Sequence, residues 1–367
     1  MENKTIRILN IVPNMRAAGI ETFIMNVYRN IEREKVQFDF LVHDEKKEFF
    51  DDEIENLGGK IHRLTFKDDK NIFKYIKDLN NFFKNHKEYQ IVHGHMQSMM
   101  PLYLLIAKIN KVPIRIAHSH NGNYEKTLKG FILHVFSRFS KLFSTHNWAC
   151  SKIAGEYLFG KSKFDIYYNG INVEKFKYDL NLRENVRKKF NIENKIVLLH
   201  VGRFELQKNH EFLINLFEKY CSINKNAILL LLGEGKLKNK IQDLVSAKGL
   251  KDNVIFMGIR DDVNEIMQAA DFFLLPSLYE GLPVVGVEAQ YSNIRCLFSN
   301  TITEEVKISN QAIFLKTNDE YDSWIKSISR YDRNLTKFQN LDKFEIKFIT
   351  EKIKKEYERL YDAINKK

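Results

Sequence analysis

The run I-V-L-L-H-V-G-R-F-E-L-Q-K-N-H, residues 196–210, decides the fold class. Its first six residues are almost all apolar, as expected of a strand that is buried on both faces of a parallel sheet. A glycine and a polar loop follow, and Asn209 is suited to cap a helix that begins near Glu211. A buried strand, a loop and a helix in this order are the repeating unit of a doubly wound α/β sheet.

The same unit recurs along the whole chain. Short apolar runs that we expect to be strands alternate with helical stretches, near 6–12, 38–42, 61–64, 91–93 and 114–118, and again near 227–232, 254–257, 272–275 and 295–298. A single core rarely holds 367 residues, so the alternation predicts two parallel-sheet domains. A polar stretch places their boundary between residues 1–175 and 176–344.

Two cations lie in the loop after the strand at 196–201, namely Arg203 and Lys208. Open α/β sheets bind ligands at the carboxyl ends of their strands. Arginine suits a bidentate hold on phosphate oxygens, and lysine acts as a mobile point charge. A single loop cation is usually only solvated, but two in one such loop favour an anion site.

A second motif, Y-E-G-L-P-V-V-G-V-E-A-Q, spans residues 279–290. Pro283 suits the first position of a helix, which would leave Glu280 in the loop and Glu288 on the helix. The N–H groups at such a helix start attract phosphate. Two carboxylates beside an anion cradle suit a nucleotide-sugar. The alternative is a buried strand of valines with Glu288 at its exposed end.

Together the two motifs resemble the donor site of glycosyltransferase family 4, whose members are retaining enzymes of the GT-B fold. Four further segments are similar to the branch that builds capsular polysaccharides and exopolysaccharides: A-G-I-E at 18–21, I-A-H-S-H-N at 116–121, W-A-C-S at 148–151 and Y-N-G-I-N at 168–172. The resemblance implies two Rossmann-like domains that face a cleft, the first binding the acceptor and the second the nucleotide-sugar. It also implies a final helix, at about 345–367, that crosses back to the first domain.

The resemblance assigns roles to individual residues. Arg203 and Lys208 would neutralise the diphosphate, Glu288 would bind the ribose, and Glu280 would contact the donor sugar near the reacting carbon. Gly19 would let the first loop approach the phosphates, although many members have a second glycine where this chain has Ala18. The rest of the expected donor site is Gly202, Gly281 and Leu282. We expect a hexose or N-acetylhexosamine to be moved, with retention, from a UDP-sugar to a glycan on polyprenyl diphosphate.

Histidines follow two predicted strands of the first domain. Family members have a histidine near the reacting sugars at the place of His118 and His120, and either could act there. His93 and His95 repeat the pattern and, with Asn121, are candidates for the acceptor pocket. His-x-His spacing could suggest a metal, but no third ligand of suitable spacing follows, and no D-x-D motif occurs. We therefore expect neither a metal nor a cofactor.

The net charge of +11 does not indicate nucleic acid, because the chain lacks a long basic run, zinc-finger spacing and an aromatic RNP pattern. Residues 126–141 (K-T-L-K-G-F-I-L-H-V-F-S-R-F-S-K) place apolar side chains at helical spacing between four cations. That pattern is typical of a helix on an anionic bilayer, and a core helix with solvated lysines is the alternative. We expect a cytoplasmic monomer or weak dimer, with attachment to the inner membrane face as an option.

Two other functions remain open at this point. An epimerase or phosphorylase-like enzyme of the same fold would use the nucleotide-sugar without a glycan acceptor. A non-catalytic subunit that binds a partner or RNA would turn over no nucleotide-sugar, and polyanion binding would fall steeply with salt.

Overall fold

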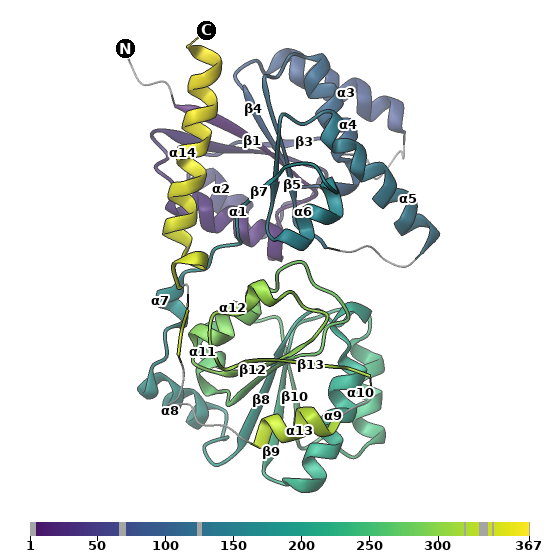
Figure 1. Ribbon diagram of the computed structural model, residues 1–367, viewed down its shortest axis with the longest axis vertical. Helices are drawn as coiled ribbons and strands as arrows, with labels where there is room; N and C mark the ends of the chain where they lie inside the picture. The colour runs from purple at the N-terminus through teal and green to yellow at the C-terminus, as the bar shows by residue number, and fades with distance from the viewer. Residues whose placement is uncertain are drawn as a thin grey trace. The chain divides into compact units, whose positions relative to one another are not determined.

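The computed structural model describes residues 5–65, 71–122, 127–318, 321–329, 337–339 and 341–366 (Figure 1). The chain divides into two compact units. Unit 1 comprises Met1–Ile171 and Lys343–Lys367, and unit 2 comprises Asn172–Asp342. The chain thus leaves unit 1 after Ile171, whereas the sequence placed the boundary after residue 175.

Unit 1 contains a seven-stranded parallel sheet in the order β3-β2-β1-β4-β5-β6-β7. Its strands are β1 (Ile6–Val12), β2 (Val36–Val42), β3 (Ile61–Arg63), β4 (Ile91–Gly94), β5 (Ile114–Ser119), β6 (His146–Ala149) and β7 (Asp165–Ile166). Its helices are α1 (Gly19–Asn30), α2 (Asp51–Asn56), α3 (Ile72–Asn85), α4 (Met100–Ile109), α5 (Leu128–Ser137), α6 (Lys152–Phe159) and α14 (Ile346–Asn365). The strands β6 and β7 had no counterpart in the sequence prediction.

Helices cover both faces of this sheet, which is why its strands are apolar without alternation. Ile8 of β1 belongs to the core formed with α1 and α14, and the next residue, Leu9, belongs to the core formed with α3 and α4. The last helix, α14, packs against α1 and β2 through residues at helical spacing such as Ile353 and Tyr357 (Figure 1). The expectation that the final helix returns to the first domain is therefore confirmed.

Unit 2 contains a six-stranded parallel sheet in the order β10-β9-β8-β11-β12-β13. Its strands are β8 (Ile196–Val201), β9 (Ala227–Leu232), β10 (Val254–Gly258), β11 (Phe272–Leu275), β12 (Arg295–Ser299) and β13 (Ala312–Leu315). Its helices are α7 (Val173–Phe176), α8 (Leu180–Lys189), α9 (His210–Ile223), α10 (Lys238–Ala247), α11 (Val263–Ala269), α12 (Val284–Tyr291) and α13 (Tyr321–Ser329).

The strand orders place two loops at the switch points of their sheets. In unit 1, β1 lies between β2 and β4, and in unit 2, β8 lies between β9 and β11. The connections leave such a central strand in opposite directions, and open α/β sheets bind ligands in the resulting crevice at the carboxyl ends. Gly19 follows β1, and Arg203 and Lys208 follow β8, so each lies at a switch point of its own unit.

Candidate donor site and histidine cluster

Lys208 and Glu280 join the two motifs in unit 2. The Lys208 Nζ lies 2.6 Å from Glu280 Oε1, and the side chains are only 15% and 9% exposed. Gln207 reinforces the contact, because its Nε2 donates to the Tyr279 carbonyl at 3.0 Å and to Glu280 Oε2 at 3.2 Å. The loop after β8 is therefore fixed to the loop after β11, and sequence reasoning had not found the part that Gln207 plays.

Arg203 differs from Lys208 in that its side chain is exposed. Its guanidinium makes no hydrogen bond or ion pair within the part of the chain that the structure describes. The neighbouring Gly202 is tightly packed, since a Cβ there would lie 3.0 Å from His200 Nε2 and 3.1 Å from Lys208 Cδ. The loop thus presents one cation to solvent and holds a second against a carboxylate.

Two glycines after β9 pack closely against the backbone of this loop. Gly233 has φ +132°, and a Cβ there would lie 2.2 Å from the Gly202 carbonyl oxygen. A Cβ at Gly235 would lie 2.6 Å from the Phe204 carbonyl oxygen. The Phe204 N–H donates to the Glu234 carbonyl at 3.0 Å. The sequence showed this Gly-x-Gly only as a turn after a strand, and its contact with the cationic loop was missed.

Glu288 lies on α12, as expected, so the alternative of a buried valine strand is wrong. Pro283 occupies the N-cap position with φ −76° and ψ 94°, one residue before the predicted position, and no side chain caps this helix. Glu288 is half-buried, and burial raises the pKa of its carboxyl to about 7. Gly281 and the buried Leu282 lie in the loop that leads into α12.

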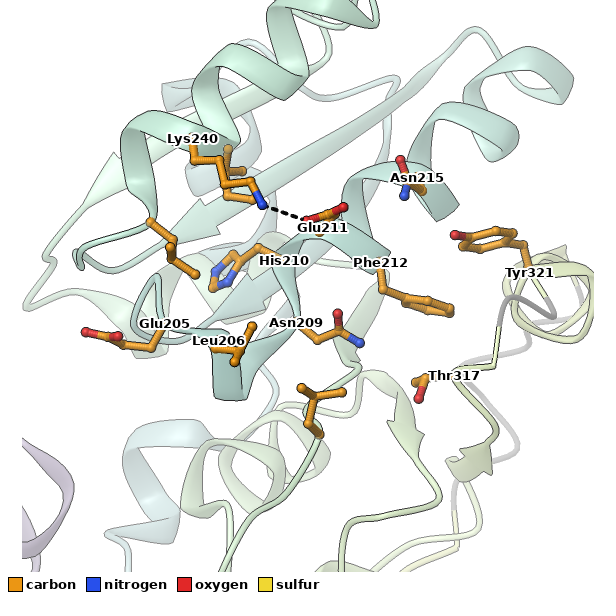
Figure 2. Close-up of a pocket in the computed structure, with 13 residues that line it drawn as sticks. Glu205, Leu206, Asn209, His210, Glu211, Phe212, Asn215, Lys240, Thr317 and Tyr321 are labelled. Atoms are coloured by element: carbon orange, nitrogen blue, oxygen red, sulfur yellow. Dashed lines mark hydrogen bonds and ion pairs between the residues drawn. The ribbon is translucent and has the colours of Figure 1, made fainter. Parts of the chain in front are cut away.

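A pocket of about 390 Å³ borders the same loop (Figure 2). Its lining includes Glu205, Leu206 and Asn209 from the loop, and Phe212 and Tyr321 contribute stacked rings. The four predicted donor-site residues with charged side chains do not line it. It is therefore a separate hollow of unit 2, and we do not assign the diphosphate to it.

Asn209 departs from its predicted role. It precedes α9, which begins at His210, but it adopts a left-handed conformation with φ 54° and ψ 47°. Its side chain makes no capping hydrogen bond. The residue therefore turns the chain from the 3-10 segment Leu206–Lys208 into α9 without capping it.

In unit 1, Gly19 is the first residue of α1. A Cβ at this position would meet no atom within 4 Å, so packing inside unit 1 does not require a glycine. Ala18 in the N-cap position provides no capping side chain. The start of α1 is thus open to close approach by a ligand, which is what the expected role of Gly19 needs.

Neighbouring strands β4 and β5 bring four histidines together. His93 Nε2 lies 3.0 Å from His118 Nδ1, and His95 Nδ1 lies 2.9 Å from His120 Nε2. Burial lowers the pKa of all four rings, that of His120 to about 3, so they are neutral at pH 7. His118 is fully buried, while His120 retains slight exposure.

The structure corrects the reason for excluding a metal. Nitrogens of His93, His95 and His118 lie within 4.8 Å of one another, so a third potential ligand is present. Sequence spacing could not show it, because parallel pairing of separate strands brings it there. However, both nitrogens of His93, both of His95 and Nδ1 of His118 already hydrogen-bond to side chains, and a metal would have to displace those bonds. Of the nitrogens of these three rings, only Nε2 of His118 has no partner among the described residues. Metal independence remains a prediction.

His95 and Asn121 line a second pocket, of about 530 Å³, in unit 1. Lys129, His134 and Tyr157 are also part of its wall. The other three clustered histidines do not line it, and His93, proposed for the acceptor pocket, instead hydrogen-bonds to Tyr357. Two of the three residues proposed for an acceptor pocket therefore border one hollow.

The apolar side chains of α5 and the turn after it point to solvent. We call the following residues the α5 apolar surface: Leu128, Phe131, Ile132, Val135, Phe136 and Phe139. Their exposed fractions range from 39% for Phe136 to 77% for Leu128. These side chains are not part of the core of unit 1, so the core-helix alternative is wrong for this unit. Lys126 lies outside the described residues, and in the described chain no helix is long and apolar enough to cross a bilayer.

Comparison with known proteins finds two family models. Residues 17–175 match the model described as Glycosyltransferase Family 4, and residues 183–339 match the model described as Glycosyl transferases group 1. A putative glycosyltransferase from Bacillus subtilis (strain 168), EpsF, is 32% identical over 340 residues, which are 90% of this chain and 88% of that protein. Both halves of the chain therefore resemble glycosyltransferases.

Two further relatives have more specific names. The capsular polysaccharide biosynthesis glycosyltransferase CapH from Staphylococcus aureus is 26% identical over 372 residues, with 96% of this chain and 98% of that protein covered. An Escherichia coli UDP-Gal:alpha-D-GlcNAc-diphosphoundecaprenol alpha-1,3-galactosyltransferase is 27% identical over 276 residues, 71% of each chain. The predicted similarity to capsular polysaccharide enzymes is confirmed.

Among solved structures, Anabaena Alr3699/HepE in complex with UDP-glucose matches with a TM-score of 0.75 and 14% identity. The match covers 98% of this chain and 100% of that chain. At this identity the similarity concerns the fold alone. The fold class is GT-B, as predicted.

Proposed function

The chain belongs to the family 4 glycosyltransferases, and we propose that it transfers a hexose or N-acetylhexosamine from a UDP-sugar, with retention of the anomeric configuration. The acceptor is a glycan carried on polyprenyl diphosphate in polysaccharide synthesis. The observation that supports this most directly is the contact between Lys208 and Glu280, which joins a cationic loop to a motif with two carboxylates.

Charge stabilisation is the main catalytic contribution that unit 2 can make. Negative charge builds on the diphosphate as the bond to the sugar breaks, and fixed cations lower the energy of that state. Arg203 is free to grip phosphate oxygens, whereas Lys208 is held in place by Glu280. Glu280, next to the lysine, is positioned to accept a hydrogen bond from a donor-sugar hydroxyl.

Two features of unit 1 are consistent with the proposal of a lipid-linked acceptor. Its 530 Å³ pocket is bordered by His95, Asn121 and Lys129, and Lys129 lies on α5. The α5 apolar surface lies on the same helix, so a glycan in the pocket and a membrane at the surface would be close together. The E. coli relative acts, by its name, on a diphosphoundecaprenol-linked sugar.

A donor panel tests the proposed function. UDP- and GDP-sugars are screened for thermal stabilisation of the protein, and the best donors are incubated with a sugar linked to undecaprenyl diphosphate. We expect a UDP-sugar to stabilise the protein and a product with retained anomeric configuration to form. Turnover of the donor without any glycan acceptor would instead indicate the epimerase or phosphorylase-like alternative. Absence of turnover with all donors would indicate a non-catalytic subunit.

Glu288 predicts a pH-dependent affinity for UDP. A ribose hydroxyl donates to the ionised carboxylate, so binding favours the form that exists above pH 7. The affinity should therefore fall as the pH is lowered from 8 to 6, by at most about tenfold per pH unit. Calorimetric titration of wild type and Glu288→Gln separates this from the titration of UDP itself. Equal slopes in the two proteins would contradict the ribose role.

The Glu288→Gln variant, which should bind UDP less tightly than wild type, should be more stable than wild type. The folded pKa of Glu288 is above its unfolded value of about 4.3, so its contribution to stability is lost as the pH rises between these two values. Glu288→Gln lacks this loss and should melt at a higher temperature than wild type at pH 8. A variant that gains stability and loses affinity would show that Glu288 is kept for binding.

Transfer should persist in excess EDTA. Arg203 and Lys208 supply the positive charge that a divalent metal would otherwise supply to the diphosphate. The assay uses protein that has been incubated with the chelator and then dialysed. Loss of activity that Mn²⁺ or Mg²⁺ restores would count against this arrangement.

A further inference from the structure

The four buried histidines of unit 1 form two hydrogen-bonded pairs, His93 with His118 and His95 with His120. A neutral imidazole has one protonated nitrogen, which donates, and one bare nitrogen, which accepts. Burial keeps these rings neutral at pH 7. The position of the proton on one ring of a pair therefore fixes its position on the other.

Tyr357 determines which ring of the first pair, His93 or His118, donates the hydrogen bond between them. The Tyr357 hydroxyl oxygen lies 2.6 Å from His93 Nδ1, and the residue is buried. Burial raises the pKa of this hydroxyl well above its usual value, so the group keeps its proton. Among the described residues, His93 Nδ1 is its one hydrogen-bond partner. A buried hydroxyl that did not donate would lose a hydrogen bond, so it donates to His93 Nδ1.

The remaining protons follow in order. His93 accepts at Nδ1, so its proton is on Nε2, and this N–H donates to His118 Nδ1. The proton of His118 must then be on Nε2. We propose that Tyr357, acting through His93, holds His118 as the neutral Nε2–H tautomer, so that His118 presents a hydrogen-bond donor and not a base.

The Nε2 of His118 is the last nitrogen of this chain of hydrogen bonds. It is buried and has no partner among the described residues. His118 lines neither of the two pockets, so no ligand reaches it in this conformation. Its ring stacks on that of His120 at 4.1 Å, and His120 retains slight exposure. If the proposed function is right, His118 therefore acts through His120 and not on the sugar itself. Tyr357 and His93 are then positioning residues for the transfer.

In the second pair, His95 with His120, no neighbour in the described chain determines which ring donates the hydrogen bond. His95 Nε2 lies 3.1 Å from Asn10 Oδ1, and the Asn10 amide nitrogen has no partner among the described residues. A carboxamide can turn over and offer either its oxygen or its NH₂ group. The structure therefore assigns a tautomer to His118 and leaves that of His120 open, which distinguishes two histidines that the sequence could not separate.

Nitrogen NMR of the full-length protein tests the assignment without any substrate. In protein labelled with ¹⁵N-histidine, coupling across the N–H···N bond between His93 and His118 identifies the pair and shows which nitrogen carries the proton. We expect a protonated Nε2 and a bare Nδ1 on His118. A proton on His118 Nδ1 would overturn the proposal, and so would a stoichiometric response of both rings to added Zn²⁺. Because no donor or acceptor is present, the result does not depend on the proposed transferase activity.

Tyr357→Phe tests whether the Tyr357 hydroxyl sets the tautomer of His118. It removes the hydroxyl and keeps the ring, so His118 should populate both tautomers while His95 and His120 are unchanged. Tyr167→Phe is the matched control, since Tyr167 is buried in the same aromatic cluster, with its ring centroid 4.1 Å from that of Trp148, but lies outside the chain of hydrogen bonds. The kcat of Tyr357→Phe should fall by up to about tenfold, with KM little changed. A His118 spectrum identical to that of wild type would show that Tyr357 does not set the tautomer.

Discussion

Arg203→Ala should lower the kcat/KM of sugar transfer at least about a hundredfold, the usual loss when one donor to a developing anion is removed. The side chain is exposed and makes no contact with charged groups in the described chain, so its removal should leave the melting temperature unchanged. Steady-state kinetics with the preferred UDP-sugar and thermal melting measure the two effects. A variant that melts normally and transfers at nearly the wild-type rate would remove Arg203 from the site.

Lys208→Ala should lose activity to a similar degree and should also lose stability. The lysine is the ion-pair partner of Glu280, whose side chain is only 9% exposed, and a buried carboxylate without its partner is costly. Lys240→Ala is the matched control in the same unit. Lys240 also pairs with a glutamate, Glu211 at 3.0 Å, but both side chains are mostly exposed (Figure 2). That variant should keep its activity, because exposed ion pairs contribute little to the free energy of unfolding.

The central strands of both sheets were predictable because they are continuous apolar runs. The predicted strands at 196–201, 227–232 and 272–275 have the bounds observed for β8, β9 and β11. The missed strands are short and lie at or near the edges of their sheets, with β7 consisting of Asp165 and Ile166. Two residues cannot show a periodicity, so their pairing with β6 decides the conformation.

The chemical types in the candidate site were also predictable, but their contacts were not. A loop cation and a loop carboxylate are visible in the sequence, whereas the 2.6 Å contact of Lys208 with Glu280 depends on β8 and β11 being neighbours in the sheet. In the sequence Gly233 indicates only a turn, whereas in the structure it packs against the Gly202 carbonyl. Tyr357 lies on the last helix, and nothing in its local sequence connects it with His93.

The histidine cluster and the cationic loop suggest a common principle in the two units. Each contains a group whose state is set by a partner that would not itself touch the substrate. Gln207 donates to Glu280, and Tyr357 donates to His93. Such partners keep a polar group in one orientation before the ligand arrives, which is how preorganised sites lower the barrier of a charge-separating reaction. Their replacement should therefore change kcat more than KM.

The full-length protein should sediment with vesicles that contain anionic lipid, and high salt should release it. The α5 apolar surface provides side chains for shallow insertion, and the cations beside it are Lys129, Arg138 and Lys141. Each cation near an anionic surface contributes about 1 kcal/mol, and no acidic residue occurs from 127 to 141. Salt weakens this attraction because it screens the surface charge.

Replacing Phe131, Phe136 and Phe139 together by serine should weaken vesicle binding by roughly a hundredfold. The three side chains are between 39% and 50% exposed in the structure, so inserting them in lipid removes about half of each ring from water, which corresponds to about 1 kcal/mol per residue. Phe73→Ser is the matched control, because Phe73 is 80% exposed on α3 of the same unit, outside the α5 apolar surface. A normal melting curve for the triple variant shows that unit 1 is intact. If the wild type does not bind anionic vesicles at low salt, the α5 apolar surface does not face a membrane and must be covered by something else.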